Sequence, residues 1–92
     1  LFDGIVVTNY LYRPHLDQLP KMLANGGVLI YETFAQGNEA FGKPSNPNFL
    51  LKTGELLTLA QRHGLKVVAY EDLYQNDPKP AMMQRICAVK EV

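Results

Sequence analysis

The chain has 92 residues, 47% of them hydrophobic, and its nine basic and nine acidic side chains cancel at neutral pH. This length allows one domain at most, and the apolar fraction is that of a protein with a packed core rather than of a disordered segment. Phosphate binding needs clustered Lys and Arg, and no stretch concentrates one sign of charge, which argues against nucleic acid as a main partner.

Cysteine content and apolar runs bear on the compartment. The single Cys87 cannot form an internal disulfide, which predicts a reducing, cytoplasmic setting, and its apolar neighbours predict a buried, inert thiol. The apolar runs are much shorter than a membrane span, so no membrane partner is expected. The chain begins Leu1-Phe2-Asp3, without the basic region of a signal peptide, and the missing initiator Met indicates truncation or processing.

The first half predicts strand, helix, strand. Residues 2–8 are a continuous apolar run, typical of a parallel strand covered on both faces. A helix is expected to run to Asn25 from an N-cap at Asp17, which places Pro20 in the first turn, where its missing N–H matters little. The Asn25-Gly26-Gly27 sequence is a strong helix stop, and residues 28–33 form the second strand.

The second half predicts a long loop, a helix and a hairpin. Residues 34–52 are rich in Gly, Asn, Pro and Ser, and a loop of this length is more often functional than not. A helix is expected from an N-cap at Thr53 to a stop at Gly64. The last two strands, 65–73 and 82–89, are separated by too few residues for a crossover helix and must be antiparallel.

These elements predict an α/β fold. Right-handed crossovers give a parallel sheet that ends in a C-terminal antiparallel hairpin, with the first strand as a hydrophobic edge. Helices would cover both faces in a complete protein. The chain contains no Gly-x-Gly-x-x-Gly, so the backbone cradle that commonly opens a nucleotide-binding α/β domain is missing.

Three segments, in order, resemble the C-terminal half of a class I S-adenosylmethionine-dependent methyltransferase. Residues 2–10 (Phe-Asp-Gly-Ile-Val-Val-Thr-Asn-Tyr) are similar to the family's fourth strand and the turn after it. Residues 25–32 (Asn-Gly-Gly-Val-Leu-Ile-Tyr-Glu) resemble the Pro-Gly-Gly turn into the fifth strand, with Asn25 in place of proline. Residues 51–56 (Leu-Lys-Thr-Gly-Glu-Leu), followed by 64–68, are similar to the helix opening before strand six in tellurite-resistance-type and related small-molecule methyltransferases.

The resemblance implies a partial Rossmann-like methyltransferase sheet in which the last strand inserts between the two before it. It also implies that S-adenosylmethionine is the cofactor of the parent protein and that a small molecule accepts the methyl group. The family's glycine-rich first turn and the acidic residue that holds the ribose belong to segments absent from this sequence. We therefore expect this chain alone not to bind the cofactor.

The first candidate site residues follow the first strand, because ligands of open parallel sheets bind beyond the carboxyl ends of strands. In the family this turn lies beside the methionine part of the cofactor, which implies cofactor contacts from Thr8, Asn9 and Tyr10 and catalytic placement of the acceptor by Asn9 and Tyr10. Tyr12 and Arg13 would contact substrate. The alternatives are that Asn9 caps a turn on which the tyrosines pack, and that Arg13 is solvated.

The second group follows the second strand. Glu32 would be a catalytic base or hold a substrate ammonium group, unless it points outward. The loop after it would be a lid hinged at Gly37 and Gly42, or else a surface excursion held by its phenylalanines. Substrate contacts are expected from Phe34, Gln36, Asn38 and Phe41.

Other chemistry has little support in the sequence. His15 and His63 lack metal-ligand spacing, and His63 is expected to complement the C-terminal end of its helix. Ser45 has no Gly-x-Ser-x-Gly context for a hydrolase. The leading hypothesis is a methyltransferase fragment that is inactive alone. The alternative is a non-catalytic α/β module that forms a homodimer through the exposed first strand, and a dehydrogenase remnant is a weaker third.

Overall fold

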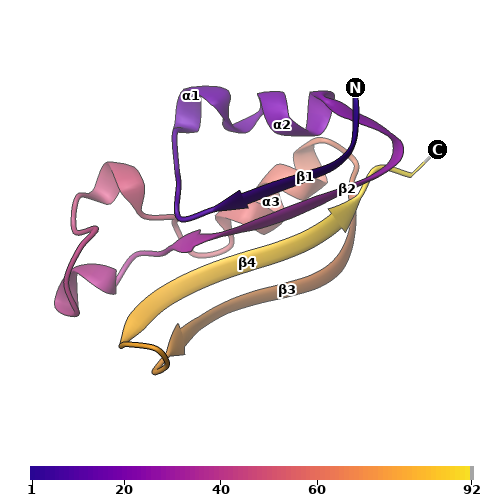
Figure 1. Ribbon diagram of the computed structural model, residues 1–92. Coiled ribbons are helices and arrows are strands. Elements are labelled where there is room, and N and C mark those ends of the chain that lie inside the picture. Colours follow the sequence, from indigo (N-terminus) through magenta and orange to yellow (C-terminus); the bar gives the residue numbers. More distant parts are fainter. Residues whose placement is uncertain (92) are drawn as a thin grey trace.

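A four-stranded mixed sheet organises the chain (Figure 1). The computed structural model describes residues 1–91, so Val92 of the predicted 1–92 domain lies outside the described residues. The elements are β1 (Phe2–Thr8), α1 (Arg13–Leu16), α2 (Gln18–Lys21), β2 (Leu23–Phe34), the 3-10 helices η1 (Asn38–Ala40) and η2 (Pro47–Phe49), α3 (Glu55–Arg62), β3 (Lys66–Gln75) and β4 (Ala81–Val89).

The strand order is β1-β2-β4-β3, with β1 parallel to β2 and β4 antiparallel to both of its neighbours. The partial Rossmann-like sheet and its C-terminal antiparallel hairpin are therefore confirmed. β4 also lies between β2 and β3, as the resemblance implied. Both crossovers advance in the same direction across the sheet, so right-handed connections place their helices on one face.

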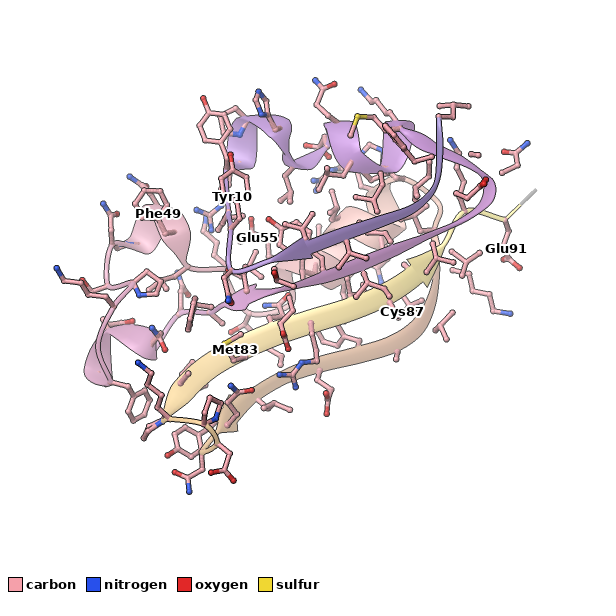
Figure 2. The ribbon with its side chains drawn as sticks, viewed as in Figure 1. Tyr10, Phe49, Glu55, Met83, Cys87 and Glu91 are labelled. Carbon is pink, nitrogen blue, oxygen red and sulfur yellow. The ribbon has the colours of Figure 1, made fainter. Side chains whose placement is uncertain are left out.

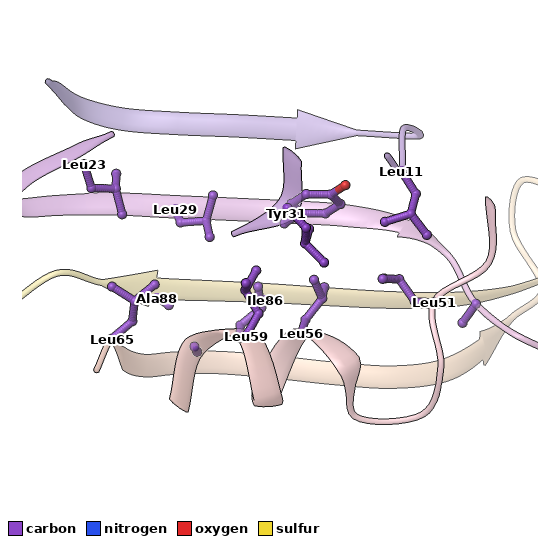
Figure 3. Packing of buried hydrophobic residues seen from close by; sticks show 13 residues of the cluster. Leu11, Leu23, Leu29, Tyr31, Leu51, Leu56, Leu59, Leu65, Ile86 and Ala88 are labelled. Carbon is purple, nitrogen blue, oxygen red and sulfur yellow. The ribbon is translucent and has the colours of Figure 1, made fainter. Parts of the chain in front are cut away.

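That face carries the core (Figure 3). Leu56 and Leu59 of α3 pack in one buried cluster with Leu29 of β2 and Ile86 of β4, and Leu16 of α1 belongs to the same cluster. Burial of one such side chain stabilises the fold by about 1.5–3 kcal/mol. This apolar face of α3 fixes the helix against the middle of the sheet.

The opposite face of the sheet has no helix among the described residues. Val6, Ile30 and Cys87 are neighbours across β1, β2 and β4, and Val6 is 67% exposed while Ile30 is 43% exposed. The prediction that residues 2–8 are covered on both faces is wrong for this chain, and so is the prediction of a buried Cys87, which is half-buried. Val6 and Cys87 lie on the bare face, because successive side chains of a strand point alternately to the two sides of the sheet.

The helix predicted from an N-cap at Asp17 to Asn25 is confirmed at its start and wrong at its end. Asp17 is the N-cap residue of α2 and Pro20 lies in the first turn, where its missing N–H is tolerated, but the helix ends at Lys21. A separate short helix, α1, precedes it, and the Asp17 side chain makes no cap bond. Its carboxylate accepts hydrogen bonds from Arg62, at 2.7 Å, and lies 2.7 Å from Nε2 of His63, and these two bonds lower the pKa of Asp17. His63 is the C-cap residue of α3, and it ties that helix to α1 and α2 through Asp17.

The glycine pair is not a helix stop but part of β2. The register with β1 jumps from Phe2–Leu23 to Gly4–Val28, so residues 24–27 form an irregular bulge. A Cβ on Gly27 would lie 2.8 Å from the Ala24 carbonyl oxygen and 3.0 Å from that of Phe2, so only glycine fits there. Helix α2 ends one turn earlier than predicted, because the backbone of the residues that follow it forms hydrogen bonds with Phe2 of β1 and with Lys90 instead.

The N-cap predicted at Thr53 is also wrong. Gly54, with a φ of 73°, occupies the cap position and offers no side chain to the first turn of α3. Gln84 of β4 replaces it, because its Oε1 accepts a hydrogen bond from the Leu56 N–H at 2.8 Å. The helix start is therefore fixed by a residue 28 positions away, which local spacing cannot indicate. No helix within residues 1–91 is both long and apolar enough to cross a membrane.

Candidate functional site

Loops gather at one end of the sheet. β1, β2 and β3 all point to the end where the 35–54 segment and the β3–β4 turn lie (Figure 1). Open α/β sheets bind their ligands beyond the carboxyl ends of their parallel strands. This end of the molecule is therefore the candidate site.

The turn after β1 is built on Asn9. Its backbone has a φ of 54°, the left-handed region that asparagine tolerates better than most side chains. Its N–H donates a 2.9 Å hydrogen bond to the Glu32 carbonyl, which places it beside the end of β2. Thr8, one residue earlier, lies on the bare face of the sheet beside Glu32, its neighbour on β2.

Tyr10 follows Asn9 in this turn. Its side chain is exposed, and its carbonyl oxygen accepts a hydrogen bond from the Tyr31 hydroxyl. Burial raises the pKa of Tyr31 to about 12, so this phenol stays protonated and keeps donating at any physiological pH. The Tyr10 backbone is thereby fixed to β2, while its ring remains free to contact a ligand.

A cavity of about 450 Å³ opens beside the Asn9 turn. The structure brings five of the predicted site residues together on its wall: Asn9, Glu32, Phe34, Asn38 and Phe41. Met83 of β4 contributes to the floor, and Figure 2 shows it toward the end of the sheet at which β1 and β2 terminate. The volume lies within the range typical of small-molecule pockets.

Glu32 joins the cavity to a row of charges across the bare face. Its carboxylate accepts a 2.5 Å hydrogen bond from Nε of Arg85, whose Nη1 donates to Glu71 at 2.9 Å and whose Nη2 donates to Gln75 at 2.9 Å. The hydrogen bonds to Glu71 and Glu32 raise the pKa of Arg85. Glu32 faces outward, as the alternative prediction had it, but it is paired rather than solvated.

The loop between β2 and α3 is closed at its base. Ala35 and Leu51 form an isolated parallel bridge, in which the Gln36 N–H donates to the Leu51 carbonyl at 2.9 Å. Asn38 is 2% exposed; its Nδ2 donates to the Pro44 carbonyl and its Oδ1 accepts from the Met82 N–H. Hydrogen bonds from Asn38 therefore hold the loop against β4, and Phe41 of the same loop packs against Tyr74 of β3.

Arg13 stands apart from the cavity and has a structural role. Its guanidinium donates to both carboxylate oxygens of Glu55, at 2.9 and 2.8 Å, and to the Leu50 carbonyl at 2.7 Å. Burial acts to raise the pKa of Glu55, but hydrogen bonds from Arg13 and the Lys52 backbone outweigh it, so the pKa of Glu55 lies below its ordinary value. The expectation that Arg13 is solvated is wrong, because this ion pair clamps α1 to α3.

Tyr12 and Gln36 do not line the cavity either. Tyr12 is the N-cap residue of α1 and packs edge-on against His15, with 4.7 Å between ring centroids. Gln36 is exposed at the base of the loop. Substrate contacts from these two and from Arg13, like the catalytic roles of Asn9, Tyr10 and Glu32, stay predictions.

Sequence reasoning missed several residues of the site. Lys43, Gln75 and Lys79 line the cavity from the loop and from the β3–β4 turn. Their position follows from the insertion of β4 between β2 and β3, which brings the hairpin turn to the carboxyl end of β2. The strand order that the resemblance implied was the one available signal, and it would have placed this turn beside the loop.

Comparison with solved structures identifies the type of fold. The chain is similar to an S-adenosylmethionine-dependent methyltransferase from Methanosarcina mazei, with a TM-score of 0.66 and 13% identity over 99% of this chain and 60% of that one. It is also similar to an O-methyltransferase family 2 protein from Planctomyces limnophilus, solved in complex with apigenin, with a TM-score of 0.57 and 16% identity over 96% of this chain and 30% of that one. No protein-family model and no curated protein sequence matches the chain.

The chain therefore has an S-adenosylmethionine-dependent methyltransferase-like fold, and it spans about three-fifths of the length of the first of these structures. Glu32, the carboxylate on the cavity wall, is paired with Arg85.

Proposed function

We propose that this chain is the C-terminal, acceptor-side half of an S-adenosylmethionine-dependent methyltransferase that acts on a small molecule. The observation that supports the proposal best is the position of Asn9. It follows the strand at the open edge of a methyltransferase-like sheet and borders a cavity of small-molecule size. The tellurite-resistance-type resemblance of residues 51–56 favours a small acceptor as well.

In this proposal the chain contributes alignment rather than covalent chemistry. Methyl transfer is an in-line displacement at the carbon that S-adenosylmethionine supplies, and its main requirement is correct placement of the acceptor atom. Asn9 and Tyr10 would orient that acceptor, Phe34 and Phe41 would contact its apolar part, and Glu32 would act as a base or hold a cationic group. Thr8 would contact the cofactor from the end of β1.

The proposal includes inactivity of the 92 residues alone. The exposed backbone edge of β1 needs a neighbouring strand, and the glycine-rich turn and ribose-binding carboxylate have to come from additional chain. The free thiol of Cys87 is consistent with a reducing, cytoplasmic compartment.

The test combines sequence and activity. The reading frame upstream of Leu1 is sequenced, and the protein it encodes is assayed for formation of S-adenosylhomocysteine with a panel of small acceptors. An apolar strand that ends in Gly-x-Gly, with an acidic residue about 20 positions later, together with product formation, supports the proposal. A frame with neither feature would contradict it.

A second candidate function rests on the bare face of the sheet. Val6 and Ile30 form an exposed apolar patch next to the free edge of β1, and such a patch marks an interaction surface. A non-catalytic module would cover it with a second copy of the chain. Sedimentation velocity distinguishes this candidate, because a module should form a stable dimer whether or not upstream sequence exists.

A further inference from the structure

The cavity beside Asn9 has an uneven charge. Three ionisable side chains with full charges lie on its wall: Glu32, Lys43 and Lys79. Glu32 and Glu71 share Arg85, at 2.5 and 2.9 Å, so this cluster of three side chains has one net negative charge at the strand side of the cavity. Among residues 1–91 neither lysine forms an ion pair, so the loop and the hairpin turn bring two unpaired positive charges to the wall.

Neighbouring carboxylates do not cancel these lysines on the wall. Glu39 lies in the same loop, but it accepts a 2.9 Å hydrogen bond from the Gly37 N–H and does not line the cavity. Asp77 is close in sequence to Lys79, yet it also lies outside the lining. The two lysines line the cavity from different segments, the loop and the hairpin turn, so a ligand in the cavity lies between these segments.

The wall also has an apolar part that is held in place. Phe34, Phe41 and Met83 form this part, and Met83 is 4% exposed. Phe41 packs against Tyr74 with 5.3 Å between ring centroids, which fixes its ring at the rim. The uncharged polar residues of the wall are Asn9, Asn38 and Gln75. An apolar body therefore fits between the phenylalanines with its polar end toward the lysines.

We propose that this cavity binds a small molecule made of a flat apolar body and one anionic group, with the anion held between Lys43 and Lys79. The inference rests on the proposed function only in naming this molecule as the methyl acceptor; the binding itself requires no cofactor. Lysines accept carboxylate and phosphate alike as point charges, so the shared feature is the negative charge.

The test uses the 92-residue chain and backbone amide chemical shifts. Benzoate and phenyl phosphate contain both an apolar ring and an anionic group. Benzamide contains the ring without the negative charge, and inorganic phosphate contains the anionic group without the ring. We expect benzoate or phenyl phosphate to give saturable shifts around Lys43, Lys79 and Phe41 at millimolar concentration or below, with benzamide and inorganic phosphate weaker by at least about threefold. Preference for phenyl phosphate over benzoate would assign the anion as a phosphate, and the reverse as a carboxylate.

Paired charge variants locate the site. The Lys43→Gln/Lys79→Gln double variant should weaken benzoate binding roughly threefold to tenfold. The control, Lys21→Gln/Lys66→Gln, removes the same charge from exposed positions outside the cavity and should leave binding unchanged. Equal binding of benzoate and benzamide, an equal loss in both double variants, or no saturable shift up to about 10 mM would overturn the inference.

The two proposals fail separately. If the anionic probes bind as expected but the longer protein transfers no methyl group, the function is wrong and the anion site stands. If methyl transfer occurs but benzoate binds no better than benzamide, the anion site is wrong and the function stands.

Discussion

The start of α3 depends on one buried side chain, and its removal should be costly. Gln84 is fully buried; its Oε1 accepts from the Leu56 N–H at 2.8 Å and its Nε2 donates to the Lys52 carbonyl at 2.9 Å. Gln84→Met keeps a similar shape but leaves the Leu56 N–H without a partner, whereas the Lys52 carbonyl still accepts a 2.9 Å hydrogen bond from the Glu55 N–H. An unsatisfied buried group costs about 1–3 kcal/mol, so we expect a loss of about 1–3 kcal/mol.

This loss is large for a chain of this size. Stabilities of about 0.05–0.15 kcal/mol per residue predict roughly 5–14 kcal/mol in total. The expected fall in Tm is roughly 4–24 °C, measured by far-UV circular dichroism. Gln84→Glu is a second variant that keeps the acceptor and loses the donor, and it should also destabilise, because its charge lies near Asp72, which is 3.4 Å from Nε2.

The matched control is Gln61→Met, an exposed position on the same helix, which should change stability by less than about 0.5 kcal/mol. If Gln84→Met is as stable as Gln61→Met, the Leu56 N–H has another partner. The account of how α3 begins would then be refuted.

Three further predictions follow from the site and its supports. Glu55→Gln should lower the free energy of unfolding at neutral pH. Hydrogen bonds hold the pKa of Glu55 below 4.5 in the folded chain, so the stabilisation by this carboxylate is present above pH 4.5 and is lost as the pH falls through the folded pKa. Urea unfolding curves of the two proteins should therefore converge in acid. Asn9→Val should cost about 1–3 kcal/mol in thermal unfolding because a β-branched side chain is strained at a φ of 54°, whereas Asn9→Gly should cost little; equal losses would contradict the backbone argument. Val6→Lys should reduce self-association in sedimentation velocity, with Thr58→Lys on the exposed side of α3 as the control, and association that Val6→Lys leaves unchanged would place the interface elsewhere.

Periodicity and turn residues were enough to predict the sheet. Apolar runs located all four strands, and the short 75–80 connection required the antiparallel hairpin. They could not predict the bulge at Gly26-Gly27, because a glycine pair ends a helix or kinks a strand equally well. Pairing with Phe2 and Lys90 decided between these outcomes, and those partners are distant in sequence.

The candidate site was predictable where it follows a strand directly. Asn9, Glu32 and Phe34 were found in this way, since each comes at or just after a strand end. Lys79 was missed because it reaches the cavity only through the strand order. Arg13 was assigned to solvent because its partner, Glu55, lies 42 residues away.

The proposed function makes this chain one half of a cofactor-dependent enzyme. Isothermal titration calorimetry with S-adenosylhomocysteine is the direct test, on the 92-residue chain and on any longer protein that the reading frame upstream of Leu1 encodes. We expect stoichiometric binding by the longer protein and no measurable binding by the chain alone. Tight, stoichiometric binding by the 92 residues, or none by the longer protein, would contradict the claim.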